Sequence, residues 1–359
     1  MIIISMDQRH PIDVGILGAT GMVGQQFIRL LSGHPWFRTA WLAASERSEG
    51  RVYSEASAWR LGDPMPPAVA ETKLEPCSPG RGPRLVFSAL DAAAADTLEP
   101  AFAAAGHIVV SNARSFRMAE DVPLLIPEIN ADHLALIDVQ RRLRGWKGAI
   151  VTNPNCAVVV LAMALAPLRQ FGIRSVLTTT LQAVSGAGYP GVPSFDVVGN
   201  VIPGIGGGEE DKIQSEPGKI LGTLTGDRVI PHPAVVSAHT TRVPVLDGHT
   251  MTVSVAFDRP VSEEEISRAL SGWRGRPQEL RLPSAPEQPI EVFADGFRPQ
   301  PRLDALRGNG MTVTVGRVRP CPVLGTRFVA LGHNTVRGAA GAALLNAELL
   351  LAEGWLRGD

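Results

Sequence analysis

Three evenly spaced glycines near the start of the chain constrain its fold more than any other feature. Gly18, Gly21 and Gly24 follow an aliphatic segment, residues 12–17, and lead into residues 25–31, which can form a helix. In a strand–turn–helix unit the first glycine permits the tight turn, the second lets a pyrophosphate approach the backbone, and the third lets the helix pack on the strand. The pattern predicts a dinucleotide site, with a βα turn that binds no ligand as the alternative. The predicted cofactor contacts are Gly18, Ala19, Thr20, Gly21, Met22 and Val23.

Strand and helix patterns alternate through the first 150 residues. An alanine-rich segment at residues 91–105 predicts a helix. Alternation of this kind is typical of a doubly wound parallel sheet. We therefore expect an α/β fold whose first part is a Rossmann-type dinucleotide-binding domain. After the first strand, short aliphatic runs predict strands at residues 40–43, 85–90, 107–110 and 124–130.

The segment after the second expected strand bears on the choice of cofactor. Folds that prefer NAD usually carry an acidic residue here for the ribose hydroxyls. Ser45, Arg47 and Ser48 could instead bind a 2′-phosphate, which favours NADP, while Glu46 between them leaves NAD open. A solvated polar loop is the alternative to any cofactor contact. Ser88, one of the small residues that end the next expected strand, is a further predicted cofactor contact.

Composition narrows the class of protein. The chain has 359 residues, of which 19% are charged, and a net charge of −1. This balance indicates no basic surface for a nucleic acid or a membrane. The three cysteines are far apart and show neither a disulfide pattern nor metal-ligand spacing. We expect a cytoplasmic protein with no bound metal, no nucleic-acid partner and no membrane partner.

A cysteine stands at an expected helix start in the middle of the chain. Residues 152–157 read Thr-Asn-Pro-Asn-Cys-Ala and precede the apolar residues 158–171. Asn155 is a suitable N-cap, which would place Cys156 in the first turn, where free N–H groups and the helix dipole favour a thiolate. We therefore expect Cys156 to be a nucleophile. A small cysteine that packs under a helix is the alternative.

The chain changes its periodicity after this helix. Residues 175–183 alternate like an antiparallel strand that includes Gln182, and a glycine-rich turn with Ser185 and Gly186 follows. Arg242 and His249 border a short apolar segment and could face one pocket, where a histidine beside a reactive cysteine would act as acid and base. The sequence predicts an α+β second domain with a mixed, largely antiparallel sheet.

Charged candidates occur in two other places. Arg117 follows the expected strand at residues 107–110 and would be either an anion ligand or a surface charge. Glu216 and Lys219 lie three residues apart, where an ordinary surface ion pair is the alternative to a binding role. Pro217 between them argues against a continuous helix.

In the order and spacing of these motifs, the sequence resembles the aspartate-β-semialdehyde dehydrogenase family. The matching motifs cover nearly the whole chain, and the ordered set is more specific than any single motif. Arg-Val-Pro-Val-x-x-Gly-His at residues 242–249 is similar to the branch of the family found in archaea, fungi and some bacteria. The other matching segments are residues 18–24, 111–118, 127–128, 153–156, 182–188, 216 with 219, and 334–340.

The resemblance implies an enzyme and its organisation. Members of the family reduce L-aspartyl-4-phosphate with NADPH to L-aspartate-4-semialdehyde in lysine, threonine and methionine biosynthesis, and the reverse reaction is an oxidative phosphorylation. The implied NADP-binding domain comprises residues 1–153 and 334–359, with a closing helix at residues 334–356. The implied catalytic and dimerisation domain comprises residues 154–333, and a homodimer or homotetramer is implied as well.

The resemblance also implies roles for the matching residues. Cys156 would be the nucleophile that forms a thioester, and His249 the acid and base. The remaining implied roles are Gln182 for orienting the thioester, Arg242 for the substrate α-carboxylate, Glu216 for its amino group, Lys219 and Arg117 for the phosphate, Asn155 for substrate binding, Asn334 for the nicotinamide, and Ser185 and Gly186 for the cofactor.

Two alternatives stay open on the sequence alone. The chain could reduce another activated acid on the same scaffold, as malonyl-CoA reductase and, more distantly, N-acetyl-glutamyl-phosphate reductase do. Glu216, the implied ligand for an amino group, argues against this alternative. The chain could also bind a nucleotide without catalysis, since a fold alone does not give a function. The presence of both Cys156 and His249 argues against that.

Overall fold

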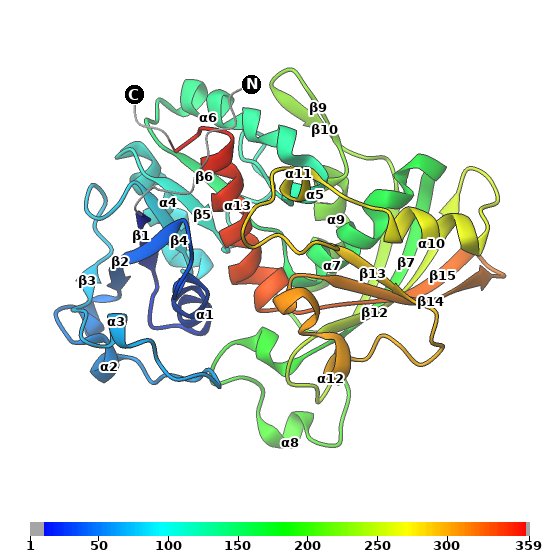
Figure 1. The fold of residues 1–359 in the computed structure, drawn as a ribbon, viewed down its shortest axis with the longest axis horizontal. Coiled ribbons are helices and arrows are strands. Elements are labelled where there is room, and N and C mark those ends of the chain that lie inside the picture. The colour runs from blue at the N-terminus through cyan, green and yellow to red at the C-terminus, as the bar shows by residue number, and fades with distance from the viewer. Residues whose placement is uncertain (1–10, 357–359) are drawn as a thin grey trace.

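The computed structural model describes residues 11–356 and contains two large sheets that lie side by side (Figure 1). The first is a parallel six-stranded sheet in the order β3-β2-β1-β4-β5-β6. This is the order of a dinucleotide-binding fold, in which ligands bind at the carboxyl ends of the strands near β1 and β4. Its strands are β1 (Ile12–Leu17), β2 (Phe37–Ala44), β3 (Glu75–Pro76), β4 (Leu85–Ser88), β5 (Ile108–Ser111) and β6 (Ala149–Thr152).

Helices cover both faces of this sheet. On one face α1 (Met22–Leu31), α6 (Leu136–Arg144) and α13 (Gly341–Ala352) share an apolar core with alternate strand residues such as Val14 and Ile16. On the other face α4 (Ala92–Ala104) contributes Phe102 to a second core. The closing helix thus returns to the first sheet, as expected, although it begins as a π-helical turn, η6 (Val336–Ala340).

The second sheet has seven strands in the order β13-β14-β15-β12-β7-β11-β8, of which only the β13–β14 and β7–β11 pairs are parallel. The prediction of a mixed, largely antiparallel sheet is confirmed, while the domain boundaries proposed from the sequence stay a prediction. Its strands are β7 (Ile173–Gln182), β8 (Ile202–Pro203), β11 (Val235–Arg242), β12 (His249–Phe257), β13 (Ile290–Phe293), β14 (Val313–Cys321) and β15 (Gly325–Gly332).

Three helices pack on one face of the second sheet. They are α7 (Cys156–Leu165), α9 (Glu209–Ile220) and α10 (Glu263–Ser271), and they bury their apolar residues with those of the strands in one core. The α7 helix is buried along its whole length after Cys156, so it fixes the position of that cysteine between the two sheets (Figure 1).

Short elements complete the described chain. The small α-helices are α2 (Tyr53–Ala56), α3 (Pro67–Ala70), α5 (Pro127–Asn130), α8 (Ser194–Val197), α11 (Arg276–Glu279) and α12 (Pro301–Asp304). The 3₁₀ turns are η1 (Glu46–Ser48), η2 (Ala131–Ala135), η3 (Ala166–Phe171), η4 (Val184–Ala187) and η5 (Arg307–Gly310), and β9 (Thr223–Thr225) and β10 (Arg228–Ile230) form a hairpin.

Two local predictions from the sequence were wrong. Residues 124–130 do not form a strand: Leu124 makes an isolated bridge to Thr152, and Pro127 starts α5, because a proline suits the first turn of a helix. Pro217 does not interrupt α9, which runs through it to Ile220. Packing of the buried residues of α9 against α7 and β11 outweighs the local cost of the proline.

Candidate active site

A cavity of about 350 Å³ lies between the glycine turn of the first sheet and the start of α7. It is lined from both halves of the molecule, which places a βα turn opposite a helix-borne cysteine. Its lining residues are Met22, Val23, Gln26, Asn112, Arg117, Asn155, Cys156, Ser185, Gly186, Ala187, Gly188, Asn334, Thr335, Gly338 and Ala339.

Asn155 caps the helix that carries the cysteine, as the sequence predicted. Its side-chain oxygen accepts hydrogen bonds from the backbone N–H groups of Ala157 at 2.9 Å and Val158 at 3.3 Å. Cys156 is therefore the first residue of α7. The cap fixes the backbone at the start of the helix, and it therefore also fixes the position of the cysteine.

His249 begins β12 and brings its ring to the cysteine. Its Nε2 lies 3.2 Å from the Cys156 sulfur, and its Nδ1 accepts a hydrogen bond from the backbone N–H of Ala183 at 3.1 Å. Because Nδ1 is occupied as an acceptor, the neutral ring carries its proton on Nε2 and directs it at the sulfur. Burial lowers the pKa of His249 to about 3, with the positive charge of Arg242 as a second cause.

The surroundings of the cysteine favour its protonated form. Burial raises the pKa of the Cys156 thiol to about 12, the Glu209 carboxylate adds to this, and Arg117 and Arg242 act in the opposite direction. The helix start predicts a thiolate, but burial outweighs that effect. The pair at the site is a neutral thiol beside a neutral imidazole.

This protonation state makes a prediction for the free protein. We expect iodoacetamide to alkylate Cys156 at a rate that rises about tenfold per pH unit between pH 7 and pH 10, because only the thiolate reacts and its fraction keeps growing below the pKa. Peptide mass spectrometry would follow each cysteine separately. Cys321 is the internal control, since hydrogen bonding from the backbone of Leu324 lowers the pKa of its thiol. A Cys156 rate that levels off near pH 7 would contradict the prediction.

Arg117 and Glu216 form a buried ion pair beside the nucleophile. An Arg117 Nη1 donates to Glu216 Oε1 at 3.0 Å, and Glu216 Oε2 accepts from the backbone N–H of Asn155 at 2.7 Å. Burial raises the pKa of Glu216, and the charge of Arg117 opposes this. Arg117, from the loop after β5, is thus connected through one carboxylate to the residue before Cys156.

Lys219 lies away from the cavity, although the sequence grouped it with Glu216. Its Nζ donates to the backbone oxygens of Arg117, Ala119 and Val122 at 2.8, 2.7 and 2.7 Å. Burial lowers the pKa of Lys219 to about 8, and the negative charge of Asp121 opposes this. Its visible effect is to fix the loop that presents Arg117 to the cavity.

Gln182 and Arg242 end two neighbouring parallel strands and are direct partners in their register. Arg242 Nη1 donates to the backbone oxygen of Ala183 at 2.6 Å. A Cβ added at Gly186 would lie 3.0 Å from Arg242 Nη1 and 3.1 Å from His249 Cε1, so a larger residue would crowd both side chains at this turn. Strands β7, β11 and β12 therefore bring Gln182, Arg242 and His249 to one end of the second sheet.

The turn between β1 and α1 has the features of a pyrophosphate site. Gly18 has a φ of +75°, and a Cβ there would meet the Ala89 backbone oxygen at 2.8 Å. Gly24 lies against the backbone of Gly18 and Ala19, where a Cβ would approach to 2.4 Å. No side chain caps the start of α1 at Gly21, so its first N–H groups suit an anion. Met22 and Val23 face the cavity, and Ala19 and Thr20 complete the turn.

The other predicted cofactor residues surround this turn. Ser45, Arg47 and Ser48 lie in or beside η1 at the end of β2, and Ser88 ends β4 and is fully buried. Across the cavity Asn334 Nδ2 donates to Ser185 Oγ at 2.8 Å, and its side-chain oxygen accepts from the backbone N–H of Gly248 at 2.8 Å. Among residues 11–356 no group of three or more metal-ligating side chains occurs.

The sequence analysis missed two parts of the site. Glu209 turned out to be buried beside Asn155 and Gln182, and its only sequence signal was its place in the acidic start of α9. The π-helical turn η6 packs on the nucleophile, where a Cβ added at Gly338 would lie 2.6 Å from that of Cys156. The small residues at 338–340 are compatible with this contact but do not predict it.

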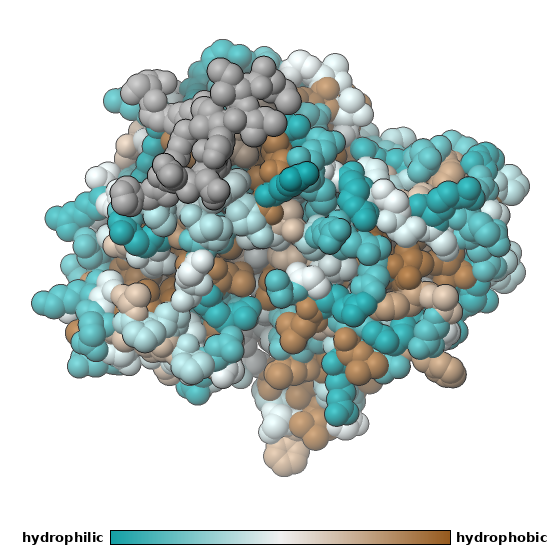
Figure 2. All heavy atoms as spheres, viewed as in Figure 1, coloured by the Kyte–Doolittle hydropathy of each residue, from teal (hydrophilic) through white to brown (hydrophobic). Residues whose placement is uncertain are grey.

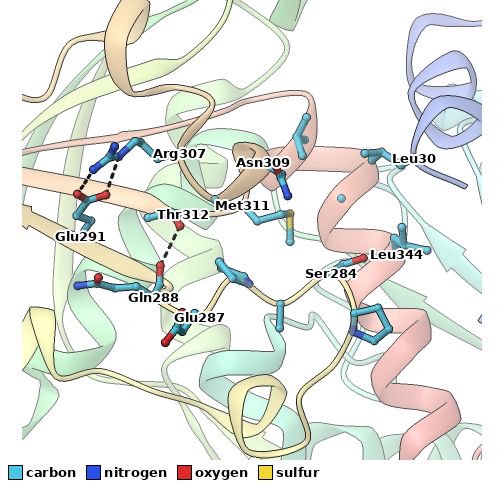
Figure 3. A pocket seen from close by; sticks show the side chains of 16 residues that line it. Leu30, Ser284, Glu287, Gln288, Glu291, Arg307, Asn309, Met311, Thr312 and Leu344 are labelled. Carbon is cyan, nitrogen blue, oxygen red and sulfur yellow. Dashed lines mark hydrogen bonds and ion pairs between the residues drawn. The ribbon is translucent and has the colours of Figure 1, made fainter. Parts of the chain in front are cut away.

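A second cavity borders the π-helical turn η6. It has a volume of about 560 Å³, and its lining combines apolar side chains with polar ones (Figure 3). The apolar ones include Leu30, Met311, Val336 and Leu344, and the polar ones include Ser284, Gln288, Asn309 and Thr312. None of the predicted site residues lines it. Arg307 and Glu291, which lie at its edge, are paired with each other.

Comparisons with known proteins identify the family of the chain. Two family models match, the "Semialdehyde dehydrogenase, NAD binding domain" over residues 13–137 and the "Semialdehyde dehydrogenase, dimerisation domain" over residues 165–337. The aspartate-semialdehyde dehydrogenase of Archaeoglobus fulgidus is 51% identical over 341 residues, which cover 95% of this chain and 98% of the relative. That of Saccharomyces cerevisiae is 42% identical over 355 residues, 94% and 97% of the two chains.

Solved structures give the same result. The Candida albicans aspartate semialdehyde dehydrogenase with NADP has a TM-score of 0.89 at 39% identity and covers 96% of this chain and 99% of its own. The Vibrio cholerae aspartate semialdehyde dehydrogenase II complexed with ASA has a TM-score of 0.76 at 26% identity, with 96% and 100% covered. With the ordered motifs, both sheets and the paired cysteine and histidine in place, the chain belongs to the aspartate-semialdehyde dehydrogenase family.

Proposed function

We propose that the protein reduces L-aspartyl-4-phosphate to L-aspartate-4-semialdehyde with NADPH and, in reverse, oxidises and phosphorylates the aldehyde. The observation that carries the proposal is the 3.2 Å approach of the Cys156 sulfur to Nε2 of His249, beside a cavity that also reaches the glycine turn. The names of the relatives from Archaeoglobus and Candida support the choice of substrate and of NADP.

The proposed chemistry proceeds through a thioester on Cys156. The sulfur attacks the acyl carbon, the bond from that carbon to the phosphate oxygen breaks, and the thiol proton leaves with the phosphate. When bound, NADPH would supply the hydride that reduces the thioester carbon. The substrate oxyanion that results expels the sulfur as a thiolate and becomes the aldehyde, and the thiolate then takes a proton from solvent, which restores the thiol. His249, as acid and base, provides the Nε2–H that faces the sulfur whenever negative charge forms there.

The substrate groups would be bound by charged residues in the cavity lining and next to it. We assign the α-carboxylate to Arg242, whose guanidinium can bind it with two hydrogen bonds, and the amino group to Glu216. Arg117 would bind the phosphate, and its position in the cavity lining supports this. Gln182 and Asn155 would orient the bound substrate and the thioester.

The phosphate role of Lys219 rests on the resemblance alone. Its ammonium already donates to three backbone oxygens, and a direct phosphate contact would require it to give up at least one of them. Holding the Arg117 loop is the contribution that its contacts support. Asn334, Ser185 and Gly186 would lie by the nicotinamide, and residues 18–23 by the pyrophosphate, with Ser45, Arg47 and Ser48 at the 2′-phosphate and Ser88 nearby.

The proposal is tested by absorbance at 340 nm. We expect the protein to reduce NADP with aspartate semialdehyde only when phosphate is present. Parallel assays with NADPH and malonyl-CoA, or with N-acetyl-glutamyl phosphate, test the alternative substrates on this scaffold. Activity with an acyl-CoA and none with the semialdehyde and phosphate would contradict the proposal.

We also propose a homodimer or homotetramer whose subunits associate through the second sheet. A dimerisation-domain model matches this part of the chain. The sheet face opposite α7, α9 and α10 carries exposed positions in adjacent strands, among them Leu177 and Val235. Sedimentation at equilibrium should give twice or four times the chain mass, and a monomer at micromolar concentration would contradict this.

No helix within residues 11–356 has the length and apolar character of a membrane span.

A further inference from the structure

Glu209 is a buried carboxylate that none of the roles above uses. It is the first residue of α9, and its side chain is 10% exposed. It does not line the active-site cavity. It nevertheless lies within hydrogen-bond distance of side chains from two other elements that carry the reaction.

Its two oxygens accept three hydrogen bonds. Oε1 accepts from Asn155 Nδ2 at 2.8 Å and from Gln182 Nε2 at 3.2 Å, and Oε2 accepts from Lys212 Nζ at 3.1 Å. Asn155 is the cap of the helix that begins at Cys156, and Gln182 ends β7. One carboxylate therefore connects the nucleophile helix with the end of the second sheet.

An ionised carboxylate only accepts hydrogen bonds, so it fixes which end of each amide faces it. Asn155 must direct its NH₂ group at Glu209, and its oxygen is then free to cap α7 through Ala157 and Val158. Gln182 must likewise turn its NH₂ group inward. A neutral amide at position 209 has one accepting oxygen for three donors, so at least one of these contacts would be lost.

The charge of Glu209 works against ionisation of the nucleophile. Its negative charge is the second cause, after burial, of the raised pKa of the Cys156 thiol. Activation of the sulfur therefore does not explain a carboxylate at this place, whereas fixing the two amides does.

We propose that Glu209 is a positioning residue, which holds Asn155 and Gln182 so that Cys156 and the substrate-orienting amide keep one relative geometry. The kinetic part of this proposal rests on the function proposed above. The effect of the carboxylate on the cysteine does not, since it can be measured without substrate or cofactor.

The test compares Glu209→Gln with the matched control Glu210→Gln. Glu210 lies in the same helix turn, and its Oε1 accepts from the backbone N–H of Thr240, which a glutamine oxygen can replace. For Glu209→Gln we expect kcat to fall about 10²-fold, the loss that a misplacement near 1 Å produces, with little change in the cofactor Kd. We expect iodoacetamide to alkylate its Cys156 about tenfold faster at pH 8, since a nearby negative charge is gone. The control should stay within about twofold of the wild type in both assays.

A lower kcat together with faster alkylation of Cys156 distinguishes this role from general damage to the fold. General damage would not speed the alkylation of Cys156 alone while the thermal melting temperature stays unchanged. Glu209→Asp keeps the negative charge but shortens the side chain, so it separates the effect of charge from that of the hydrogen bonds. Its Cys156 should be alkylated as slowly as that of the wild type, while turnover should still be lost. If Glu209→Gln does not fold, Glu209→Asp alone tests the proposal. Turnover within about threefold of the wild type in a folded variant, or slower alkylation in Glu209→Gln, would overturn the proposal. A wild-type protein inactive on aspartate semialdehyde would instead refute the proposed function and leave the alkylation result to be judged by itself.

Discussion

Replacing Cys156 with serine should abolish turnover while NADPH still binds. A serine hydroxyl is a much weaker nucleophile than a thiol and holds its proton far more tightly. Burial lowers the pKa of His249 to about 3, so its ring is too weak a base to take the proton of a hydroxyl. We expect kcat to fall on the order of 10⁴-fold or more. The glycine turn, which binds the cofactor in our proposal, lies on the other sheet and keeps its structure. Calorimetric titration with NADPH should therefore give a Kd close to that of the wild type.

Cys321→Ser is the matched control for this experiment. Cys321 ends β14 and does not line the active-site cavity, so the same chemical change there should leave kcat unaltered. Substantial turnover by Cys156→Ser would exclude the thioester route. Loss of NADPH binding together with turnover would show that the variant is damaged beyond its nucleophile.

The features that the sequence predicted well depend on local rules. The spacing of Gly18, Gly21 and Gly24 after an aliphatic strand predicts the βα turn, because each position has a steric need for glycine. The structure confirms this need at Gly18 and Gly24, where a Cβ would overlap backbone atoms. Asn155 was predicted as a cap from its place before an apolar run, and it caps α7. The approach of His249 to Cys156 was suggested by chemistry and by the family resemblance rather than by periodicity.

The features that the sequence did not predict depend on tertiary burial. Glu209 belongs to a run of three acidic residues at a helix start, which is typical of an exposed helix, and nothing local shows that one of the three turns inward. The high pKa of the Cys156 thiol has burial as its largest cause, whereas the helix start that suggested a thiolate is local. The spacing of three residues groups Lys219 with Glu216, but the backbone carbonyls that Lys219 binds belong to a loop about 100 residues earlier in the chain.

Loss of the Arg337 guanidinium should strongly destabilise the fold. Arg337 lies in η6, and its Nη1 and Nη2 donate to the two oxygens of Glu128 at 2.7 and 2.8 Å. The side chains are 1% and 0% exposed. In Arg337→Met the carboxylate stays buried without its partner, which typically costs about 3–5 kcal/mol. The midpoint of urea unfolding, followed by tryptophan fluorescence, should fall accordingly.

Two variants show whether the buried charge is the cause. Arg276 pairs with Glu279 and Glu353 at the surface, so Arg276→Met removes an arginine with exposed partners and should cost about 1 kcal/mol or less. The double variant Glu128→Leu/Arg337→Met removes both charges, and we expect it to recover much of the lost stability, because no uncompensated charge is left in the core. Equal losses in Arg337→Met and Arg276→Met would contradict this account. Since η6 also packs on Cys156 through Gly338, the double variant should then be assayed for turnover, which reports whether the ion pair also holds the turn against the nucleophile.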